Sequence, residues 1–283
     1  MKRQRDDEAP SEVKRQTGSL HGKVILITGG TQGQGLATAR MCVSRGASGI
    51  VICGRNEENG KKAAAELAAL GSADILYVQC DVSKPEAIAD VVSKADDKFG
   101  RIDGLVNCAG DSTRGDLDST TADEWDRQMS INLRSHFLFT QHVSKVMRRT
   151  RTRGSIVNIA SVQAYGGLTF CLPYAVAKAG LVALTKNNAS ELAPHGIRVN
   201  AVNMGWCVTD NEIKLQTAQG GEDWIEKADQ SVPLGRISRP DDIAHAILFL
   251  LSDEAYTTGS VMAMHPEYIH GILGGAIGKS ADL

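Results

Sequence analysis

Long apolar runs, a surplus of charge and paired cysteines are all missing from this sequence. No apolar stretch reaches the roughly 18–20 residues of a membrane-spanning helix, so we expect no membrane partner. The 31 Lys and Arg are balanced by 33 Asp and Glu, and this near neutrality argues against a basic surface for nucleic acid. Hydrophobic residues, at 42% of the 283, are sufficient for a sizeable core.

The cysteines and histidines indicate neither a disulfide framework nor a metal site. Several of the six cysteines lie within apolar, strand-like runs, and none forms a Cys-x-x-Cys pair. We expect reduced, buried thiols, which suit an intracellular, cytoplasmic protein. The seven histidines are scattered without metal-ligand spacing, so no metal is expected. The cysteines are Cys42, Cys53, Cys80, Cys108, Cys171 and Cys207.

The first 19 residues differ in kind from the rest of the chain. They carry charges of both signs and almost no large apolar side chain, so we expect residues 1–19 to form a disordered tail. The segment lacks the apolar centre of a signal peptide, and its four acidic residues argue against a transit peptide. Its two basic clusters leave a nuclear signal as the alternative.

From residue 20 onward, short apolar runs alternate with helix-like stretches. Apolar strands separated by helices are typical of a parallel sheet with both faces covered, and right-handed crossovers make such a sheet doubly wound. We therefore predict an α/β fold, a seven-stranded parallel Rossmann sheet in one domain over residues 20–283. The expected strands are Val24–Thr28, Gly49–Cys53, Ile75–Cys80, Gly104–Ala109, Ser155–Ser161, Arg198–Asn203 and Ser260–Met264. The expected helices are Gln34–Arg45, Glu57–Leu70, Pro85–Phe99, Ala122–Met147, Tyr174–Leu192 and Asp241–Leu251.

One stretch, residues 206–238, breaks the alternation after the sixth strand. It contains two helix-like pieces, Glu212–Ala218 and Glu222–Asp229. An insertion at the carboxyl end of a strand lies where such sheets bind ligands, so a substrate lid is our hypothesis. Ordinary surface helices are the alternative.

A glycine-rich turn joins the first expected strand to the first helix. Its sequence is Thr28-Gly29-Gly30-Thr31-Gln32-Gly33-Gln34-Gly35. Glycine suits a phosphate-binding turn because a side chain would hold a pyrophosphate away from the backbone amides and from the positive end of the helix dipole. A strand before the turn and a helix after it strengthen its interpretation as a dinucleotide site.

The end of the second strand predicts which dinucleotide binds. An acidic residue there would bind the ribose hydroxyls of NAD, but the chain has Gly54 followed by Arg55. Arg55 can hold a 2′-phosphate through charge-assisted hydrogen bonds, which favours NADP over NAD, although Gln32 adds no second charge. A solvated Arg55 is the alternative. We expect Asp81 and Val82 to flank the adenine, although Asp81 can equally cap the following helix.

Tyr174 and Lys178 are spaced to share one face of a helix. An ammonium beside a phenol favours the phenolate, so we expect Lys178 to lower the pKa of Tyr174. The phenolate would take the proton of an alcohol as hydride leaves carbon, and in reverse the phenol would protonate a developing alkoxide. Ser161, at the end of the fifth strand, would hold the same substrate oxygen. An ordinary surface pair is the alternative for the Tyr–Lys spacing alone.

In their order and spacing, these motifs resemble those of the short-chain dehydrogenase/reductase family. They are Thr-Gly-x-x-x-Gly-x-Gly from residue 28, Asn-Cys-Ala-Gly from residue 107, Asn132, Ser161 and Tyr-Ala-Val-Ala-Lys from residue 174, and the resemblance covers most of the chain. It implies an NAD(P)-dependent oxidoreductase that interconverts a secondary alcohol and a ketone, usually as a homotetramer, with hydride transfer at the B face of the nicotinamide. It also implies a catalytic tetrad of Asn132, Ser161, Tyr174 and Lys178, in which Asn132 holds a water that relays protons to Lys178.

The resemblance also implies cofactor contacts beyond the glycine-rich turn. It places Asn107 beside the cofactor and Thr209 on the nicotinamide carboxamide. Three departures from the family pattern are Cys108 in place of a second Asn, Met204 in place of Pro, and an atypical C-terminus from His265. The expected cofactor-binding residues are Gly29, Thr31, Gln32, Gly33, Gln34, Gly35, Arg55, Asp81, Val82, Asn107, Ala109, Gly110, Tyr174, Lys178, Gly205, Val208 and Thr209.

Substrate, activity and assembly each keep an alternative. Ser161, Gln163 and Trp206 are the expected substrate contacts, and a mixed polar and aromatic pocket suits a sugar, a polyol or a modest cyclic ketone without excluding a steroid or an acyl thioester. A catalytically silent cofactor-binding sensor or scaffold is the alternative to the enzyme, and a dehydratase or isomerase is a variant of it. Excess apolar residues in the helices at 122–147 and 174–192 predict a homotetramer or homodimer, with a slightly apolar monomer as the alternative.

Overall fold

The computed structural model describes residues 19–265, apart from the side chains of residues 219 and 220. The predicted tail, residues 1–19, therefore lies outside the described residues except for Ser19, and so does the atypical C-terminus after His265. Within the described part, no helix is both long and apolar enough to cross a membrane.

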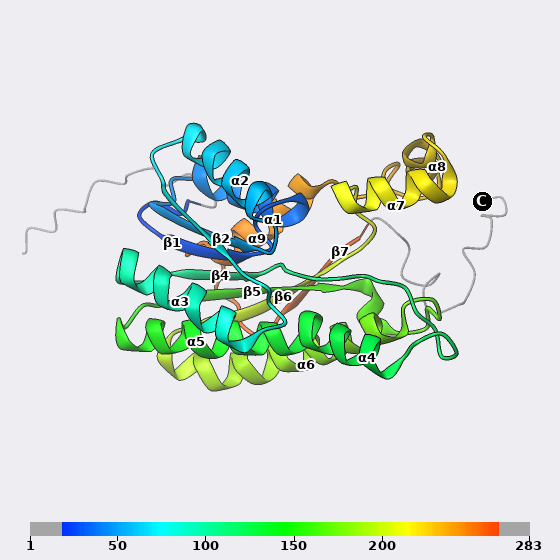
Figure 1. Ribbon diagram of the computed structural model, residues 1–283. Helices are drawn as coiled ribbons and strands as arrows, with labels where there is room; N and C mark the ends of the chain where they lie inside the picture. The colour runs from blue at the N-terminus through cyan, green and yellow to red at the C-terminus, as the bar shows by residue number, and fades with distance from the viewer. Residues whose placement is uncertain (1–18, 266–283) are drawn as a thin grey trace, which may run out of the picture.

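Seven parallel strands form one sheet in the order β3-β2-β1-β4-β5-β6-β7 (Figure 1). The chain starts at the centre of the sheet, builds outward to β3, crosses back to β4 and then builds outward to β7. This arrangement confirms the predicted doubly wound α/β fold. The strands are β1 (Val24–Thr28), β2 (Gly49–Gly54), β3 (Asp74–Gln79), β4 (Gly104–Asn107), β5 (Ser155–Ser161), β6 (Arg198–Met204) and β7 (Val261–Met264).

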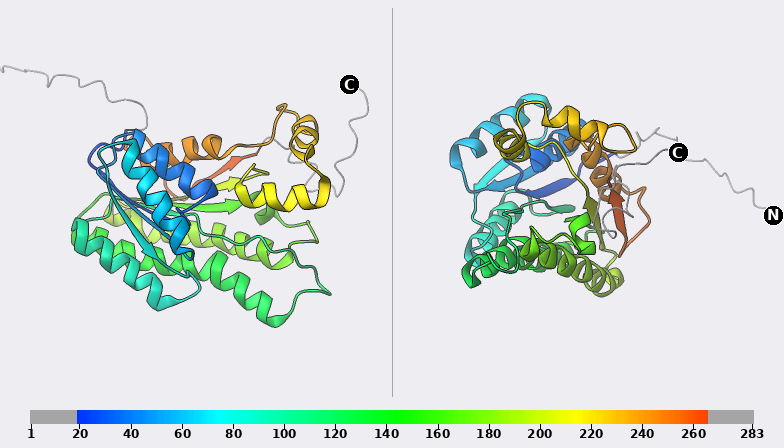
Figure 2. Two further views of the ribbon diagram at one scale, coloured as in Figure 1. Left: turned by 45° about the horizontal axis from the view of Figure 1, so that its top comes forward. Right: turned by 90° about the vertical axis from the view of Figure 1, so that its right-hand side faces the viewer.

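Helices cover both faces of the sheet (Figures 1 and 2). Three of them, α1 (Gly33–Ser44), α2 (Glu57–Leu70) and α9 (Pro240–Leu251), lie on one face and enclose an apolar core against it. The other face carries α3 (Pro85–Phe99), α4 (Ala122–Met129), α5 (Ser135–Arg149) and α6 (Leu172–Leu192) over a second core. Because the central strands are buried from both sides, they read as continuous apolar runs.

The strand β4 ends two residues earlier than predicted, at Asn107. The backbone amides of Cys108 and Ala109 both donate to the hydroxyl oxygen of Thr28, each at 3.0 Å. These bonds replace the next steps of the strand ladder and turn the chain away from the sheet. The turn carries the residues after β4 across the end of β1, which is where the predicted phosphate-binding turn begins.

The prediction of a single α-helix over 122–147 is wrong in one respect, because the helix is interrupted. A π-helical turn, Ser130–Arg134, separates α4 from α5, and the backbone amide of Ser135 donates to the carbonyl of Ser130. Helical hydrophobic spacing continues through this turn, so the sequence pattern did not reveal it. Single π turns inside helices are frequent at functional sites, and this one contains Asn132.

Two helices of the 206–238 stretch, α7 (Asp210–Gly220) and α8 (Trp224–Gln230), lie beyond the carboxyl ends of the strands (Figure 1). The base of the stretch is closed by two backbone hydrogen bonds. Val208 donates to Ser238, and Ser238 donates to Trp206, at 2.9 and 3.0 Å. The insertion is thus a closed excursion that leaves and re-enters the domain at one point.

Candidate functional site

A groove of about 270 Å³ runs along the carboxyl ends of four adjacent strands, β3, β2, β1 and β4. This edge is where doubly wound sheets bind ligands. Twelve of the predicted cofactor-binding residues line the groove. They are Gly29, Thr31, Gln32, Gly33, Gln34, Gly35, Arg55, Asp81, Val82, Ala109, Gly110 and Thr209.

The floor of the groove accepts only glycine at two positions. Gly29 has a φ of +65°, and a Cβ there would lie 2.9 Å from the Cα of Ala109. A Cβ on Gly35 would lie 2.3 Å from the carbonyl oxygen of Gly29. Both contacts are with backbone, which cannot move aside as a flexible side chain can. The close approach therefore leaves backbone amides exposed to a ligand, as a phosphate cradle requires.

The start of α1 already holds an anionic group. This helix has no side-chain cap and no acidic residue in its first turn. Instead, the backbone amide of Gly33 donates at 3.4 Å to the carboxylate of Asp210, the first residue of α7. The carboxylate oxygen stands in for a phosphate oxygen, since both are anionic acceptors at the positive end of a helix dipole. The amides at this helix start can therefore bind a phosphate oxygen of a dinucleotide in place of the Asp210 carboxylate.

The residues at the end of β2 are suited to binding the 2′-phosphate of NADP. They leave little room for the acidic side chain that would bind the ribose hydroxyls of NAD. A Cβ on Gly54 would lie 2.6 Å from the hydroxyl oxygen of Thr31, so an acidic side chain there has no room unless Thr31 moves. Arg55 follows and lines the groove. Burial alone would raise the pKa of Asp81, but hydrogen bonds from Ser83 and the charges of Arg55 and Lys84 outweigh it, and this pKa is lowered. Arg55 is therefore near Asp81, at the adenosine end.

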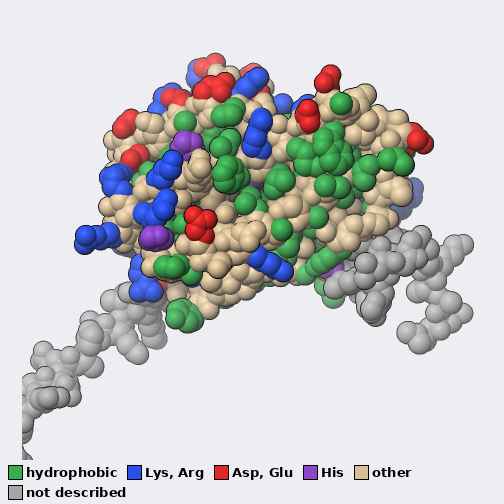
Figure 3. All heavy atoms as spheres, turned by 90° about the horizontal axis from the view of Figure 1, so that it is seen from below, with side chains coloured by type: hydrophobic (Ala, Val, Ile, Leu, Met, Phe, Trp, Pro, Cys, Tyr) green, Lys and Arg blue, Asp and Glu red, His purple; other side chains and the backbone are tan. Residues whose placement is uncertain are grey.

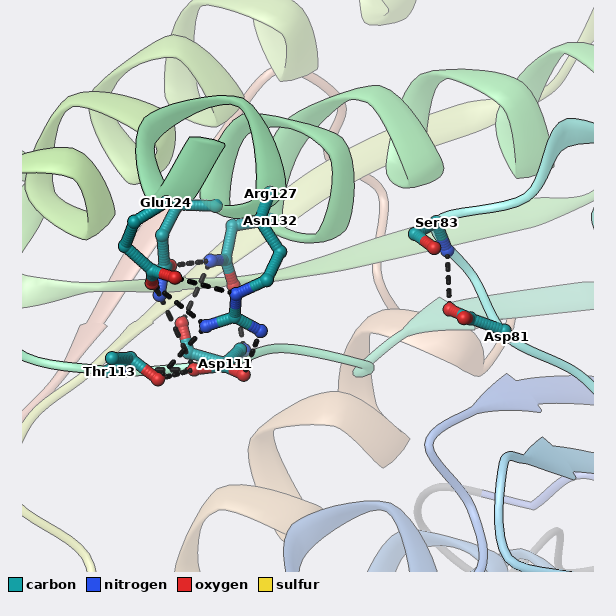
Figure 4. A network of polar contacts seen from close by, with 8 residues as sticks. Asp81, Ser83, Asp111, Thr113, Glu124, Arg127 and Asn132 are labelled. Atoms are coloured by element: carbon teal, nitrogen blue, oxygen red, sulfur yellow. Dashed lines mark hydrogen bonds and ion pairs between the residues drawn. The ribbon is translucent and has the colours of Figure 1, made fainter. Parts of the chain in front are cut away.

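Asp81 does not cap the following helix. Its carboxylate accepts a hydrogen bond from the backbone amide of Ser83 at 3.0 Å and so stabilises the turn before the helix (Figure 4). The helix α3 begins at Pro85, and the residue at its N-cap is Lys84.

Five predicted cofactor residues do not line the groove. The amide of Asn107 is buried and donates to the side-chain oxygens of Asn158 and Thr140, at 2.9 and 3.3 Å. Gly205 donates its backbone amide to the carbonyl of Met264 at 2.9 Å. The others are Val208, in the base of the insertion, and Tyr174 and Lys178, which lie beyond Gly110. Contact of these five with a cofactor stays a prediction.

Sequence reasoning missed eight residues that line the groove. Most are direct neighbours of predicted ones, so extending each motif by one or two positions would have found them. Asp210 and Asn211 follow Thr209, and Asp111 follows the Asn-Cys-Ala-Gly motif. The missed residues are Gly54, Asn56, Cys80, Cys108, Asp111, Ile131, Asp210 and Asn211.

Ser161, Tyr174 and Lys178 come together beside the groove. Ser161 ends β5, and its hydroxyl oxygen accepts a hydrogen bond from the backbone amide of Gln163 at 3.1 Å. Tyr174, in the first turn of α6, is half-buried, and its phenol is close enough to the Ser161 hydroxyl for that group to affect its pKa. The ammonium of Lys178 is buried, donates to the Ile159 carbonyl at 2.6 Å and lies 5.5 Å from the centre of the Tyr174 ring.

The expectation that Lys178 lowers the pKa of Tyr174 is wrong for this structure. Burial raises the pKa of Tyr174 to about 12, and the hydrogen bond with Ser161 offsets only part of that rise. Burial also lowers the pKa of Lys178 to about 8. Desolvation is therefore the largest effect on the pKa of each group, and the phenol stays protonated at neutral pH. This is the state that a proton donor needs for reducing a carbonyl.

Asn132 lies in the π turn and holds the chain after β4 (Figure 4). Its side-chain oxygen accepts from the backbone amide of Asp111 at 3.0 Å, and its side-chain nitrogen donates to the carbonyl of Asp111 at 2.8 Å. A Cβ on Gly110 would lie 3.2 Å from the Asn132 oxygen and 3.8 Å from the Lys178 nitrogen. Asn132 and Lys178 thus lie close together beside Gly110, and their membership of a catalytic tetrad stays a prediction.

Comparisons with known proteins agree with this geometry. Residues 29–265 match the family model described as "Enoyl-(Acyl carrier protein) reductase". The 3-oxoacyl-[acyl-carrier-protein] reductase FabG of Thermotoga maritima is 40% identical over 87% of this chain and 97% of its own. The 3-alpha-(or 20-beta)-hydroxysteroid dehydrogenase of Mycobacterium tuberculosis is 35% identical over 86% of this chain and 88% of its own. The chain belongs to the short-chain dehydrogenase/reductase family.

A solved structure extends the likeness to three dimensions. L-sorbose reductase from Gluconobacter frateurii, in complex with NADPH and L-sorbose, has a TM-score of 0.84 and is 30% identical over 90% of this chain and 99% of its own. As a member of the short-chain dehydrogenase/reductase family, the chain is an NAD(P)-dependent oxidoreductase. The named relatives give no support to the catalytically silent sensor or scaffold.

The predicted substrate contacts of this dehydrogenase/reductase lie in two places. The side-chain oxygen of Gln163 accepts from the thiol of Cys171 at 3.3 Å, next to the Ser161–Tyr174 pair. Trp206 instead packs its ring 5.8 Å from that of Trp224 and donates to the carboxylate of Glu212 at 2.8 Å, within the insertion. Substrate contact by Gln163 and Trp206 stays a prediction. Among residues 19–265, no cluster of three His, Cys, Asp or Glu side chains is placed to hold a metal.

The pKa values predict opposite pH dependences for the two directions of catalysis. If Lys178 relays protons to Tyr174 as predicted, carbonyl reduction should slow as the pH rises above about 8, because Lys178 then loses its proton. Alcohol oxidation needs the phenolate, so it should accelerate with pH, since the pKa of Tyr174 is about 12. Measuring kcat/KM in both directions over roughly pH 6–10 tests this. A reductive profile that stays flat over that range would contradict it.

Proposed function

We propose that this protein interconverts a ketone and a secondary alcohol, with Tyr174 as the general acid/base. The nicotinamide cofactor supplies or accepts the hydride. The Ser161 hydroxyl and the Tyr174 phenol bind the carbonyl oxygen, and the phenol gives its proton to the developing alkoxide. Lys178 and Asn132 then resupply that proton. In the other direction the same groups remove the proton of the alcohol.

The observation that carries the proposal is that Tyr174, Ser161 and Lys178 lie together, with Lys178 close to Gly110 at the edge of the groove. Two hydroxyl groups that lie close together can bind a single oxygen atom. The buried ammonium of Lys178 lies 5.5 Å from the centre of the Tyr174 ring. An oxygen held by two donors, with a cation near one of them, is what the reduction of a carbonyl requires.

We propose a compact ketone with polar or cyclic character as the substrate. Around the pair, Gln163 offers an amide, while Tyr165 and Phe170 are exposed aromatic rings. Arg114 lies 5.4 Å from the centre of the Phe170 ring. This mixed rim suits a ketose or a cyclic ketone, and the L-sorbose reductase supports the former by analogy. The acyl and steroid activities named for the relatives are the competing classes.

A substrate panel tests the proposed function directly. We expect the purified protein to oxidise NADPH in the presence of at least one ketose or cyclic ketone, measured by the loss of absorbance of the reduced nicotinamide. A 3-oxoacyl thioester and a 3-oxosteroid serve as comparison substrates. Tight NADPH binding without turnover on any member of the panel would contradict the proposal and favour a sensor.

We propose NADP(H) as the preferred cofactor. Arg55 lines the adenosine end of the groove, and the crowding of Gly54 against Thr31 disfavours the acidic side chain that NAD would use. A guanidinium can bind a 2′-phosphate with two parallel hydrogen bonds. The complex of L-sorbose reductase with NADPH supports the same preference by analogy.

Arg55→Ala should abolish this preference. We expect kcat/KM with NADPH to fall about 10–100-fold, because the variant loses a pair of charge-assisted hydrogen bonds to the 2′-phosphate. The value with NADH should change by less than about threefold, because NADH has no 2′-phosphate. Steady-state kinetics with both cofactors measures this. Equal losses with the two cofactors, or a wild-type preference for NADH, would refute the role of Arg55.

We propose that residues 206–238 form a lid on the single domain. The lid has its own small core of Trp224, Ala228, Val232 and Ile237, so it can move as a unit. It touches the glycine-rich turn through Asp210 on Gly33 and through a 3.5 Å hydrogen bond between Gln32 and Asn211. Ligand-dependent protection of 206–238 from hydrogen exchange would support a lid, and unchanged exchange would refute it.

We propose that the protein assembles as a homodimer or homotetramer through the face of α4, α5 and α6. Apolar side chains gather on this face (Figure 3), and Trp125, Phe137 and Val176 on it are 36–42% exposed. Covering such a patch with a second copy would bury apolar surface. Light scattering should give a mass two or four times the 30.2 kDa of the chain, and a monomer would contradict the proposal.

We propose a cytoplasmic location, for which the cysteines are the support. All six are free thiols, and five of them are buried. Free thiols persist in reducing compartments. Cell fractionation that finds the protein in an oxidising compartment would refute this.

A further inference from the structure

The side chain of Asn132 has no freedom in this site. It is fully buried, and its two bonds to the backbone of Asp111 use one lone pair of its oxygen and one of its two N–H groups. The other N–H donates to the side-chain oxygen of Gln128 at 2.5 Å. Gln128 thus completes the hydrogen bonding of the Asn132 amide.

Gln128 is itself fully buried and sits between Asn132 and two carboxylates. Its nitrogen donates to Asp111 at 3.3 Å and to Glu124 at 3.0 Å. Carboxylates can only accept, so they force the nitrogen of Gln128 toward themselves and its oxygen toward Asn132. That oxygen in turn forces the Asn132 nitrogen toward Gln128. The two acids, acting through Gln128, therefore reinforce the orientation of the Asn132 amide that its bonds to the Asp111 backbone also require.

Arg127 keeps both acids ionised and in place (Figure 4). Its guanidinium donates to Asp111 at 2.7 Å, to both carboxylate oxygens of Glu124 at 2.8 Å, and to the hydroxyl of Thr113 at 3.0 Å. Burial would raise the pKa of Asp111, but hydrogen bonds from Arg127 and Thr113 outweigh it and lower this pKa to about 2. At neutral pH both acids are therefore pure acceptors, as the orientation of Gln128 requires.

We infer that Gln128 is a positioning residue for catalysis, and that Arg127, Asp111 and Glu124 act through it to fix the orientation of Asn132. The inference rests on the proposed function, because Asn132 acts in the proton supply to Lys178 and Tyr174. A turned or loosened Asn132 would release the chain at Gly110–Asp111, which it clamps beside Lys178. The proton step would then slow. Gly110 and Asp111 also line the groove, but the phosphate-binding turn and Arg55 lie outside this network and would still hold the adenosine and diphosphate groups of the cofactor.

Gln128→Met tests the inference, because methionine has a similar length and no hydrogen-bonding amide. We expect kcat for carbonyl reduction to fall about 10–100-fold, as for removal of a residue that orients a catalytic group. The Kd for NADPH should stay within about threefold of wild type. Lys62→Met, at an exposed position of α2 away from the site and from the proposed subunit interface, is the control and should leave both values unchanged.

Arg127→Lys is the second variant, in case Gln128→Met does not fold. Lysine keeps the charge but loses the fork that holds both acids, so we expect a smaller loss of kcat, about 3–30-fold, again with unchanged NADPH binding. If each variant that folds keeps the wild-type kcat on a ketone that wild type reduces, the inference is overturned. If wild type reduces no ketone, it is the proposed function that fails.

Discussion

The close approach of β1 and β4 at their carboxyl ends is the constraint on which the site depends. The Thr28 hydroxyl ends β4 by accepting hydrogen bonds from two backbone amides. The absence of a side chain on Gly29 lets Ala109 pack against the Gly29 backbone. On one side of this contact the chain forms the glycine-rich turn. On the other side it passes Gly110 and reaches Asp111, which Asn132 holds. Cofactor groove and proton-handling groups therefore share one support, and a side chain on Gly29 would disturb both.

Burial determines the protonation states of the two groups held beside this contact, Tyr174 and Lys178. Tyr174 and Lys178 lie close together, yet desolvation separates their pKa values to about 12 and about 8. The site is thereby prepared for proton donation at neutral pH, and a cationic nicotinamide beside Tyr174 would favour the phenolate during oxidation. Asp111 is also partly buried, but its hydrogen bonds with Arg127 and Thr113 lower its pKa and keep it ionised.

The sheet and the main motifs could be predicted from sequence because each depends on local pattern. The run of buried residues in β5 and the glycines from Gly29 to Gly35 are examples. The π turn at Asn132 could not, since helical spacing continues through it. The buried hydrogen bonds of Asn107 could not be predicted either, because its partners Thr140 and Asn158 are far away in sequence and only the fold brings them close. The sign of the pKa shift of Tyr174 depends on burial, which the Tyr–Lys spacing does not report.

Proton transfer by Tyr174 is tested most directly by kcat/KM for ketone reduction by Tyr174→Phe, with NADPH binding measured on the same preparation. We expect a loss of about 10²–10⁴-fold, the contribution of a general acid, with NADPH still bound. A folded Tyr174→Phe protein that reduces the ketone within about twofold of the wild-type rate would contradict it.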